Sequence, residues 1–346
     1  MSYSVISYDE LHARASNENL RAYPIEISHK DNNFHQVQIT PEGTLCLKSG
    51  DDGKRWELSP NALEQLCKDA SFPTSYAHVC PVDLLQHYLA WRYTQKTYRY
   101  QMIVDENDRV LMLAPTTFTL VPTRRILETV DEVLSLNPLT FTPTVVRADD
   151  YSSMVYYTTE DIAWETRRGG LIYGSWVLQT SPMGKLIARI CPGTLQVVCN
   201  NGMIMCRRER LREPMRRGRR DEAGILEEIV NSIPGYNHIL EVTLRTIGPS
   251  ENIRVRSLGL ALHSLRARCS EEISYEEIQA VREYLERISY TEKVSSIENM
   301  FDVMAAISYA AQRAGFDLAT TARLEEFAGC FHRLHEYGYD YDDFLI

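Results

Sequence analysis

Eight arginines stand close together between Arg207 and Arg220, where the sequence reads RRERLREPMRRGRR. Two glutamates accompany them, so the segment carries an excess of six positive charges on a chain whose formal net charge is −10. A guanidinium group is planar and presents paired N–H donors that match the oxygens of a phosphate. The acidic remainder of the chain repels polyanions, so we expect local binding of nucleic acid. The predicted phosphate contacts are Arg207, Arg208, Arg210, Arg212, Arg216, Arg217, Arg219 and Arg220.

The strand-like sequence before this segment combines aromatic rings with further cations. Single-stranded nucleic acids are held by such a combination, because bases stack on the rings while cations contact the backbone. We expect Tyr173 or Trp176 to stack on bases. The alternative is that these rings pack against each other across a sheet. The predicted site is extended by the cations Arg167, Arg168, Lys185 and Arg189.

The arginine segment also has other interpretations. Its guanidinium groups could pair with carboxylates of a partner subunit or of this chain, and the acidic C-terminal residues Asp340, Asp342 and Asp343 are candidates. They could also lie in a solvated loop without a partner. A salt-dependent affinity for nucleic acid distinguishes the first interpretation, since phosphate binding releases counterions.

No residue pattern in the sequence indicates an enzyme. Cys199 lies in a Cys-Asn-Asn-Gly sequence that is typical of a turn, and the nearest histidine in sequence is His238. The eight cysteines form no C-x-x-C pair, and Cys330 with His332 and His335 supplies only one half of a usual zinc site. A phosphate-binding loop of the G-x-x-x-x-G-K-S/T type is absent. We therefore predict no catalytic residue, no metal ion and no cofactor.

Composition indicates an ordinary globular protein. Hydrophobic residues make up 44% of the 346 residues and charged residues 24%, so the chain can bury a sizeable core. The first residues turn polar at once, and no apolar run is long enough to span a membrane. These features predict a cytoplasmic protein whose cysteines are mostly buried thiols.

The order of patterns predicts an α+β fold, with antiparallel sheets and short helices in the N-terminal two thirds and a helical C-terminal third. We expect an antiparallel meander from Tyr23 to Leu58, followed by a helix that Ser59 caps and Pro60 begins. A second helix should run from Pro81 to Tyr93. The side chains predicted to face inward on that helix are Leu84, Leu85, Tyr88 and Trp91, with Gln86, His87, Arg92 and Gln95 outward.

Three regions are expected along the chain. Residues 1–22 are predicted to form a loosely docked N-terminal arm, residues 23–250 an α+β core domain, and residues 251–346 a helical region packed on the core. Ser274 with Glu277 and Ser295 with Glu298 each have the spacing of a helix capping box. Gly315 is predicted to close the helix that follows the second box.

Several passages together resemble a family of phage- and plasmid-borne proteins of unknown function. They are LSPNALEQLCKDASFPTSY, HVCPVDLLQHYLAWRY, VLMLAPTTFTLVPTRRILETV, VVCNNGMIM, NMFDVMAAISYAAQ and LEEFAG. VVCNNGMIM is similar to the family's Cys-(Thr/Asn)-Asn-Gly signature, here Cys199 to Gly202. The sequence departs from the family at Thr116, Thr117 and Phe118, where an arginine and a tyrosine are more typical. The resemblance implies a mobile-element setting and no particular chemistry.

These observations predict a non-enzymatic phage- or plasmid-type protein that binds nucleic acid in the host cytoplasm. Single-stranded DNA is expected rather than RNA, in replication or recombination, with an annealing-like role and a possible homo-oligomer. The alternative is a protein-interaction or self-assembling phage protein that acts on a host or phage partner. Its interface would then be the helical C-terminal third with the acidic tail.

Overall fold

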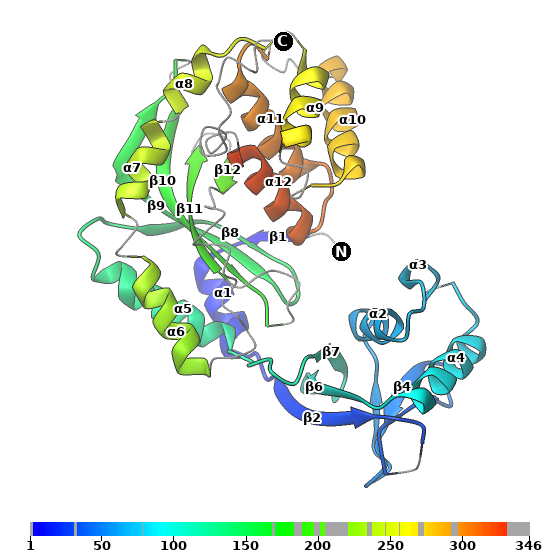
Figure 1. The fold of residues 1–346 in the computed structure, drawn as a ribbon. Coiled ribbons are helices and arrows are strands. Elements are labelled where there is room, and N and C mark those ends of the chain that lie inside the picture. Colours follow the sequence, from blue (N-terminus) through cyan, green and yellow to red (C-terminus); the bar gives the residue numbers. More distant parts are fainter. Residues whose placement is uncertain are drawn as a thin grey trace. The chain divides into compact units, whose positions relative to one another are not determined.

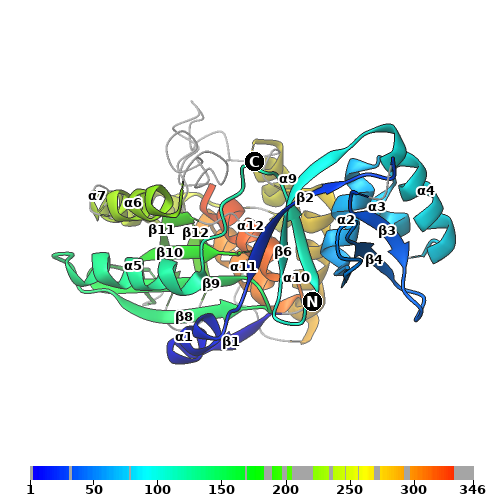
Figure 2. The same cartoon turned by 90° about the horizontal axis from the view of Figure 1, so that it is seen from below.

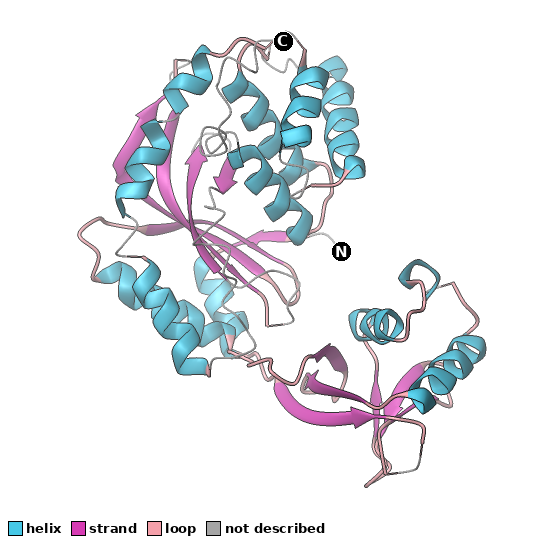
Figure 3. Cartoon of the chain, in the orientation of Figure 1, coloured by secondary structure: helices cyan, strands magenta, loops and turns pink. Residues whose placement is uncertain are grey.

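The computed structural model describes most of the chain, and contacts between Cα atoms divide it into two compact units. Unit 2 contains Asn17–Pro122 and Arg216–Ile225, and unit 1 contains Met1–Ser16, Thr123–Met215 and Leu226–Ile346. Helices and strands of both units are shown in Figure 3. The described residues are 3–30, 33–77, 79–167, 170–182, 189–196, 201–204, 221–233, 237–245, 247–255, 257–268, 273–291 and 297–330.

This division differs from the predicted regions. The first residues form strand β1 (Ser4–Ile6), which pairs with β8 (Thr142–Ala148), and helix α1 (Tyr8–Ser16) packs on α5 (Thr123–Ser135). Leu11 and Ala15 of α1 are buried, so this segment is part of unit 1 rather than a loose arm. Composition does not change at Ser16 or Thr123, and the sequence therefore gave no sign that unit 2 is inserted into unit 1.

Unit 1 is built on a six-stranded sheet in the order β1-β8-β9-β10-β11-β12, with every neighbouring pair antiparallel (Figure 2). The pairing places Arg147 of β8 opposite Met154, Met154 opposite Gln179, and Gln179 opposite Arg189. These four side chains therefore form one row across four strands, on the same face of the sheet. The longer strands are β9 (Ser153–Glu165), β10 (Leu171–Thr180) and β11 (Arg189–Gln196), and β12 (Asn201–Ile204) is last.

Helices cover both faces of this sheet (Figure 1). On the face that carries the row, Leu318 and Ala322 of α12 (Leu318–Cys330) pack against Val177 and Cys191. On the opposite face, α7 (Asn237–Arg245) contacts β9, β10 and β11. Gly174 of β10 lies at this contact, where a Cβ atom would be 3.5 Å from Leu240 of α7, an ordinary van der Waals distance. Helix α6 (Glu222–Ser232) is divided between the two units after Ile225. The remaining helices of unit 1 are α8 (Ile247–Asn252), α9 (Leu258–Arg268), α10 (Tyr275–Thr291) and α11 (Met300–Arg313).

One of the two predicted capping boxes is confirmed. The Ser274 backbone N–H donates to Glu277, and the Glu277 N–H donates to the Ser274 hydroxyl. The second box is wrong in position, because α11 is capped by Asn299, with Asp302 closing the box. An asparagine caps a helix as well as a serine does, and the sequence offered both within one turn. Gly315, with φ of +81°, follows the end of α11 as predicted.

Unit 2 contains two three-stranded antiparallel sheets, β2-β6-β7 and β3-β4-β5. The predicted meander is confirmed for β3 to β5, whereas the strand before it pairs with β6 instead. Isolated bridges join Ile27 to His35 and Leu58 to Val110, which connects the edges of the two sheets. The strands are β2 (Arg21–Ile27), β3 (Gln36–Ile39), β4 (Leu45–Lys48), β5 (Arg55–Glu57), β6 (Tyr98–Val104) and β7 (Val110–Ala114).

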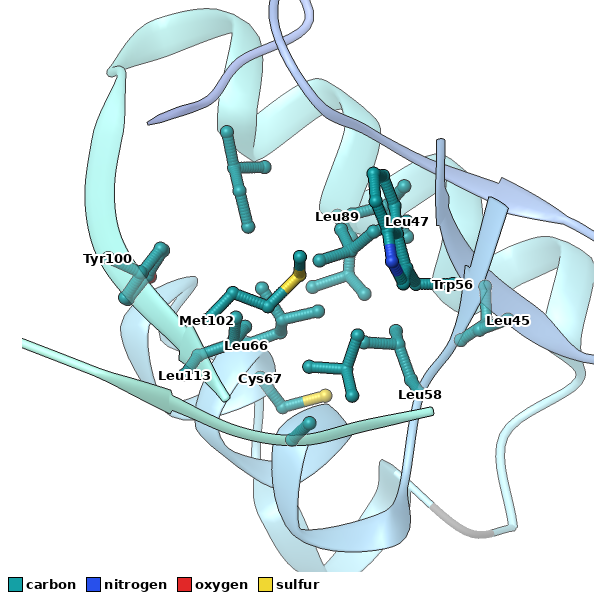
Figure 4. Packing of buried hydrophobic residues seen from close by; sticks show 14 of the residues in the cluster. Leu45, Leu47, Trp56, Leu58, Leu66, Cys67, Leu89, Tyr100, Met102 and Leu113 are labelled. Carbon is teal, nitrogen blue, oxygen red and sulfur yellow. The ribbon is translucent and has the colours of Figure 1, made fainter. Parts of the chain in front are cut away.

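The core of unit 2 is apolar and lies between these strands and the helices α2 (Pro60–Asp69) and α4 (Val82–Gln95) (Figure 4). Leu47, Leu66 and Leu89 are among its fully buried members. Helix α2 begins as predicted, since the Ser59 hydroxyl accepts the Ala62 N–H and Pro60 takes the first position. A single turn, α3 (Thr74–Ala77), separates the two longer helices.

The predicted α+β class, with antiparallel sheets and helices concentrated toward the C-terminus, is confirmed. Among the described residues, no helix is both long and apolar enough to cross a membrane. Cys46, Cys67 and Cys191 are buried thiols and Cys80 is half-buried. Burial raises the pKa of the Cys67 thiol to about 11, which keeps this group protonated near neutral pH.

Candidate nucleic-acid interface

The arginine segment lies outside the described residues, and so do Arg168 and Lys185. The structure does describe the elements before and after it. Strand β12 precedes the segment, pairs with β11 and contacts α11 and α12. Helix α6 follows it, and the Asp221 carboxylate accepts the Gly224 N–H at the start of this helix. Both ends of the segment are thus attached to ordered secondary structure.

Asn201 and Gly202 of the Cys-Asn-Asn-Gly sequence do not form the predicted turn. They are the first residues of β12, where Asn201 lies opposite Gln196 and Gly202 opposite Leu195. Cys199 and Asn200 lie outside the described residues. An Asn-Gly pair tolerates positive φ but does not require it, and strand pairing with β11 decides its conformation here.

Arg189 is not a surface cation as predicted. Its side chain is buried beneath α12, where the guanidinium Nε donates to Gln179 Oε1 at 2.9 Å and pairs with the Glu326 carboxylate. Side chains alternate along β11, and Arg189 points to the face of the sheet that α12 covers. Its place in the sequence, near other cations, did not show which face it would take. We therefore remove Arg189 from the predicted phosphate contacts.

A second buried ion pair lies at the other end of the same row. Arg147 Nη1 donates to Glu325 Oε1 at 2.7 Å, and Glu325 also accepts the Tyr156 hydroxyl at 2.5 Å and the Gln312 amide at 3.1 Å. Burial raises the pKa of Glu325, and Arg147 and the other donors oppose this shift. Burial lowers the pKa of Arg147, but Glu325, Tyr156 and Tyr3 together more than offset this, so Arg147 stays protonated. Adjacent glutamates of α12 thus neutralise two arginines of the sheet.

The two aromatic residues predicted to stack on bases differ in exposure. Trp176 has an exposed fraction of 0% and lies between Tyr157 and Pro192 in the sheet. It cannot receive a base in this structure, which corrects the prediction, and cross-strand packing explains its conformation. Tyr173 is half-buried, opposite Leu195 and Ala163, at the irregularity between β9 and β10.

Arg167 is exposed, near the turn between β9 and β10. Its backbone N–H donates to Glu251 Oε1 at 2.8 Å, and its guanidinium donates to the Asn252 side-chain oxygen. Glu251 and Asn252 belong to α8. Arg167 therefore connects the turn to this helix, while its charge remains open to solvent.

Sequence reasoning missed a group of exposed rings in unit 2. Leu85, Leu89 and Tyr93 form the buried side of α4, whereas Leu84 and Trp91, both predicted to face inward, are 59% and 56% exposed. Apolar residues occur all round this helix, so its sequence is compatible with more than one inward face. The structure shows that about half of the Trp91 surface is in contact with water, and an exposed aromatic side chain of this kind can mark a binding surface.

A cluster of titratable groups connects α1, α5 and β9. The Tyr8 hydroxyl donates to Asp131 Oδ1 at 2.6 Å and lies 2.6 Å from the Tyr157 hydroxyl, while His12 Nε2 is 3.3 Å from Asp131. Burial raises the pKa of both Tyr8 and Tyr157, so the phenols stay neutral and act as hydrogen-bond donors. The cluster holds α1 against the sheet. In the described part of the chain, no three histidine, cysteine or acidic side chains come together as a metal site.

Comparison of the chain with protein-family models, with curated proteins and with solved structures gives no match. The resemblance to phage- and plasmid-borne proteins therefore stays a prediction.

Proposed function

We propose that this protein binds nucleic acid through the arginine segment, single-stranded DNA in preference to RNA, and acts without catalysis. The observation that carries the proposal is the excess of six positive charges between Arg207 and Arg220 on a chain with net charge −10. Such a concentration of guanidinium groups binds a phosphate backbone and contributes little to a folded core. The setting that we propose is replication or recombination in the cytoplasm, with an annealing-like role and self-association.

Two structural features support this proposal. Glu325 and Glu326 are already paired with Arg147 and Arg189, so these carboxylates are not available to neutralise the arginine segment. In the sequence, the segment also follows the last strand of a six-stranded sheet and precedes α6.

The test is a mobility-shift titration with a labelled single strand at several salt concentrations. We expect the affinity to fall with salt, with a slope of log K against log salt close to −0.7 for each phosphate neutralised. Replacing Arg216, Arg217, Arg219 and Arg220 by alanine should reduce the slope by about 3. The matched variant with four lysines keeps the charge and should retain most of the slope. A slope that is the same in all three proteins contradicts the proposal.

Protein interaction is the second candidate, and exposed apolar side chains on the C-terminal helices favour it. Leu260 of α9 and Tyr275 of α10 are 51% and 57% exposed. Light scattering after nuclease treatment separates the candidates. Copurifying nucleic acid that nuclease removes supports the first, and an assembly without nucleic acid that dissociates in a Leu260→Ser variant supports the second.

A further inference from the structure

Trp91, on the outward side of α4, contacts the half-buried Tyr88 ring, which in turn contacts the half-buried Phe72 ring. The Trp91 and Tyr88 ring centroids are 5.9 Å apart, and those of Tyr88 and Phe72 are 5.2 Å apart. Trp91 is 56% exposed, and Tyr76 on the neighbouring turn α3 is 62% exposed. We call Phe72, Tyr88 and Trp91, together with Tyr98 at the start of β6, the α4 aromatic face.

Hydrogen bonds fix the tyrosine rings of this face. The Tyr88 hydroxyl donates to the Ala70 carbonyl at 3.1 Å, and the Tyr98 hydroxyl donates to the Asp69 carbonyl at 3.2 Å. Both acceptors lie at the C-terminal end of α2, where helix carbonyls lack partners within the helix. Each hydroxyl is therefore engaged, and the rings are held in place before any ligand binds. A ring that is already ordered loses little conformational entropy when a partner stacks on it.

Cations accompany these rings. The Lys96 ammonium lies 4.9 Å from the centroid of the Tyr98 ring, Arg92 follows Trp91 directly, and Lys68 is exposed near the end of α2. Within the described part of the chain, these three cations form no ion pair. The face thus combines rings with positive charge, which complements bases and phosphates.

We infer that the α4 aromatic face is a second contact surface for single-stranded nucleic acid, on which unpaired bases stack. The inference rests on the proposed function and deepens it, because it assigns phosphate binding to the arginine segment and base contacts to unit 2. Trp91 provides the exposed stacking surface, and Lys96 and Arg92 contact the adjoining phosphates. Every base has a π face, so this surface accepts any sequence and requires only that the bases be unpaired.

An apolar surface can also bind protein, and α4 supplies the control for that possibility. Leu84 lies two helical turns before Trp91 and is 59% exposed, next to exposed Val82. An aliphatic side chain contributes to a protein interface but offers no π surface to a base. Comparing Trp91→Ala with Leu84→Ala therefore distinguishes a nucleic-acid partner from a protein partner. Both positions are exposed enough for the variants to fold.

The experiment compares an oligothymidylate of about twenty nucleotides with an abasic deoxyribose-phosphate strand of the same length. We expect the wild-type protein to bind the oligothymidylate about tenfold more tightly, and Trp91→Ala to lose this difference while its affinity for the abasic strand is unchanged. Leu84→Ala should behave like the wild type. Trp91→Phe keeps a ring and should recover part of the difference.

The outcomes distinguish the two proposals. If the wild type binds both strands equally, or if Trp91→Ala keeps the preference for bases, the aromatic face is not a nucleic-acid surface while the arginine segment still is. If Leu84→Ala loses as much as Trp91→Ala, the face is a general apolar surface and base stacking is wrong. If the wild type binds neither strand, the proposed function fails and this inference fails with it.

Discussion

Two regions of the molecule differ in which side chains they bury and which they expose. One is the interior beneath α12 in unit 1, and the other is the outer side of α4 in unit 2. Beneath α12, Arg147 and Glu325 are buried where apolar residues would pack at lower cost. On α4, Trp91 and Leu84 are exposed where polar residues would be expected. In the first region, the buried charges pair with each other. In the second region, the exposed side chains have one side in contact with water and not with protein.

This difference separates structural from functional use of the same residue types. A buried arginine with a buried glutamate fixes where α12 lies on the sheet, because neither charge can be left alone in the core. An exposed ring beside unpaired cations contributes little to folding and is available to a ligand. Residue type alone does not distinguish the two uses. Arg189 and Trp176 are of the right type for nucleic-acid binding but lie in the core.

The largest expected effect comes from breaking the buried pair. Glu325→Ala removes the shared acceptor of Arg147, Tyr156 and Gln312 and takes away the buried carboxylate that pairs with the Arg147 guanidinium. We expect the free energy of unfolding of unit 1 to fall by about 3–5 kcal/mol. Hydrogen exchange with mass spectrometry at increasing urea concentrations measures the stability of unit 1 peptides separately from that of unit 2 peptides.

The exposed pair of Arg14 with Glu10 is the control for this prediction, because both side chains are about half exposed. Glu10→Ala should cost less than about 1 kcal/mol. Should Glu325→Ala cost no more than Glu10→Ala, the buried charges do not hold α12 on the sheet, and the contrast between the two regions fails.

Two tryptophans sharpen the comparison further. Trp176→Ala empties a fully buried position in the sheet of unit 1 and should cost about 3–5 kcal/mol. Trp91→Ala acts on an exposed ring and should change the free energy of unfolding by less than about 1 kcal/mol. Urea unfolding of the two variants measures both values. A large loss at Trp91 would mean that this ring belongs to the fold of unit 2 and is not reserved for a ligand.

The units should also respond differently to acid, because the core of unit 2 is bordered by neutral histidines. His29 Nε2 accepts the Val37 N–H at 2.9 Å, and burial lowers the pKa of His29. Burial also lowers the pKa of His35, although Asp51 and Asp52 oppose the shift. A histidine with a lowered folded pKa stabilises the protein above the unfolded pKa of about 6.5. That stability is lost as the pH falls below this value toward the folded pKa.

We therefore expect the free energy of unfolding of unit 2 to decrease between about pH 7 and pH 5. His29→Gln keeps an acceptor for the Val37 N–H but does not titrate, so this variant should show a weaker pH dependence. The same profile in the wild type and in His29→Gln would contradict the assignment.

Much of the fold followed from local sequence signals. Ser59 with Pro60 and Ser274 with Glu277 start helices through hydrogen bonds within one turn, and Gly315 ends one through its positive φ. The insertion of unit 2 could not be predicted, because pairing of Ser4–Ile6 with β8 is a contact between distant parts of the chain. Local patterns contain no information about such pairing.

The candidate site was less predictable than the fold. Alternation indicates that a strand has two faces but does not say which face a helix covers, so Trp176 and Arg189 could not be assigned to the core. The same limit applies to α4, where apolar residues on all sides made Trp91 look buried. The arginine segment was identifiable because its charge density requires no knowledge of folding.

The smallest expected effect concerns Arg167, a predicted contact that the structure leaves exposed. Its guanidinium donates to Asn252, while its backbone N–H donates to Glu251 and is retained when the side chain is replaced by that of alanine. Arg167→Ala should therefore cost about 0.5–1.5 kcal/mol of stability in unit 1, the usual contribution of one hydrogen bond. The salt dependence of binding decides whether Arg167 has a second role. If it contacts a phosphate, the slope of log K against log salt falls by about 0.7 in Arg167→Ala. If its only partner is Asn252, the slope is unchanged, and Arg167 is removed from the predicted phosphate contacts.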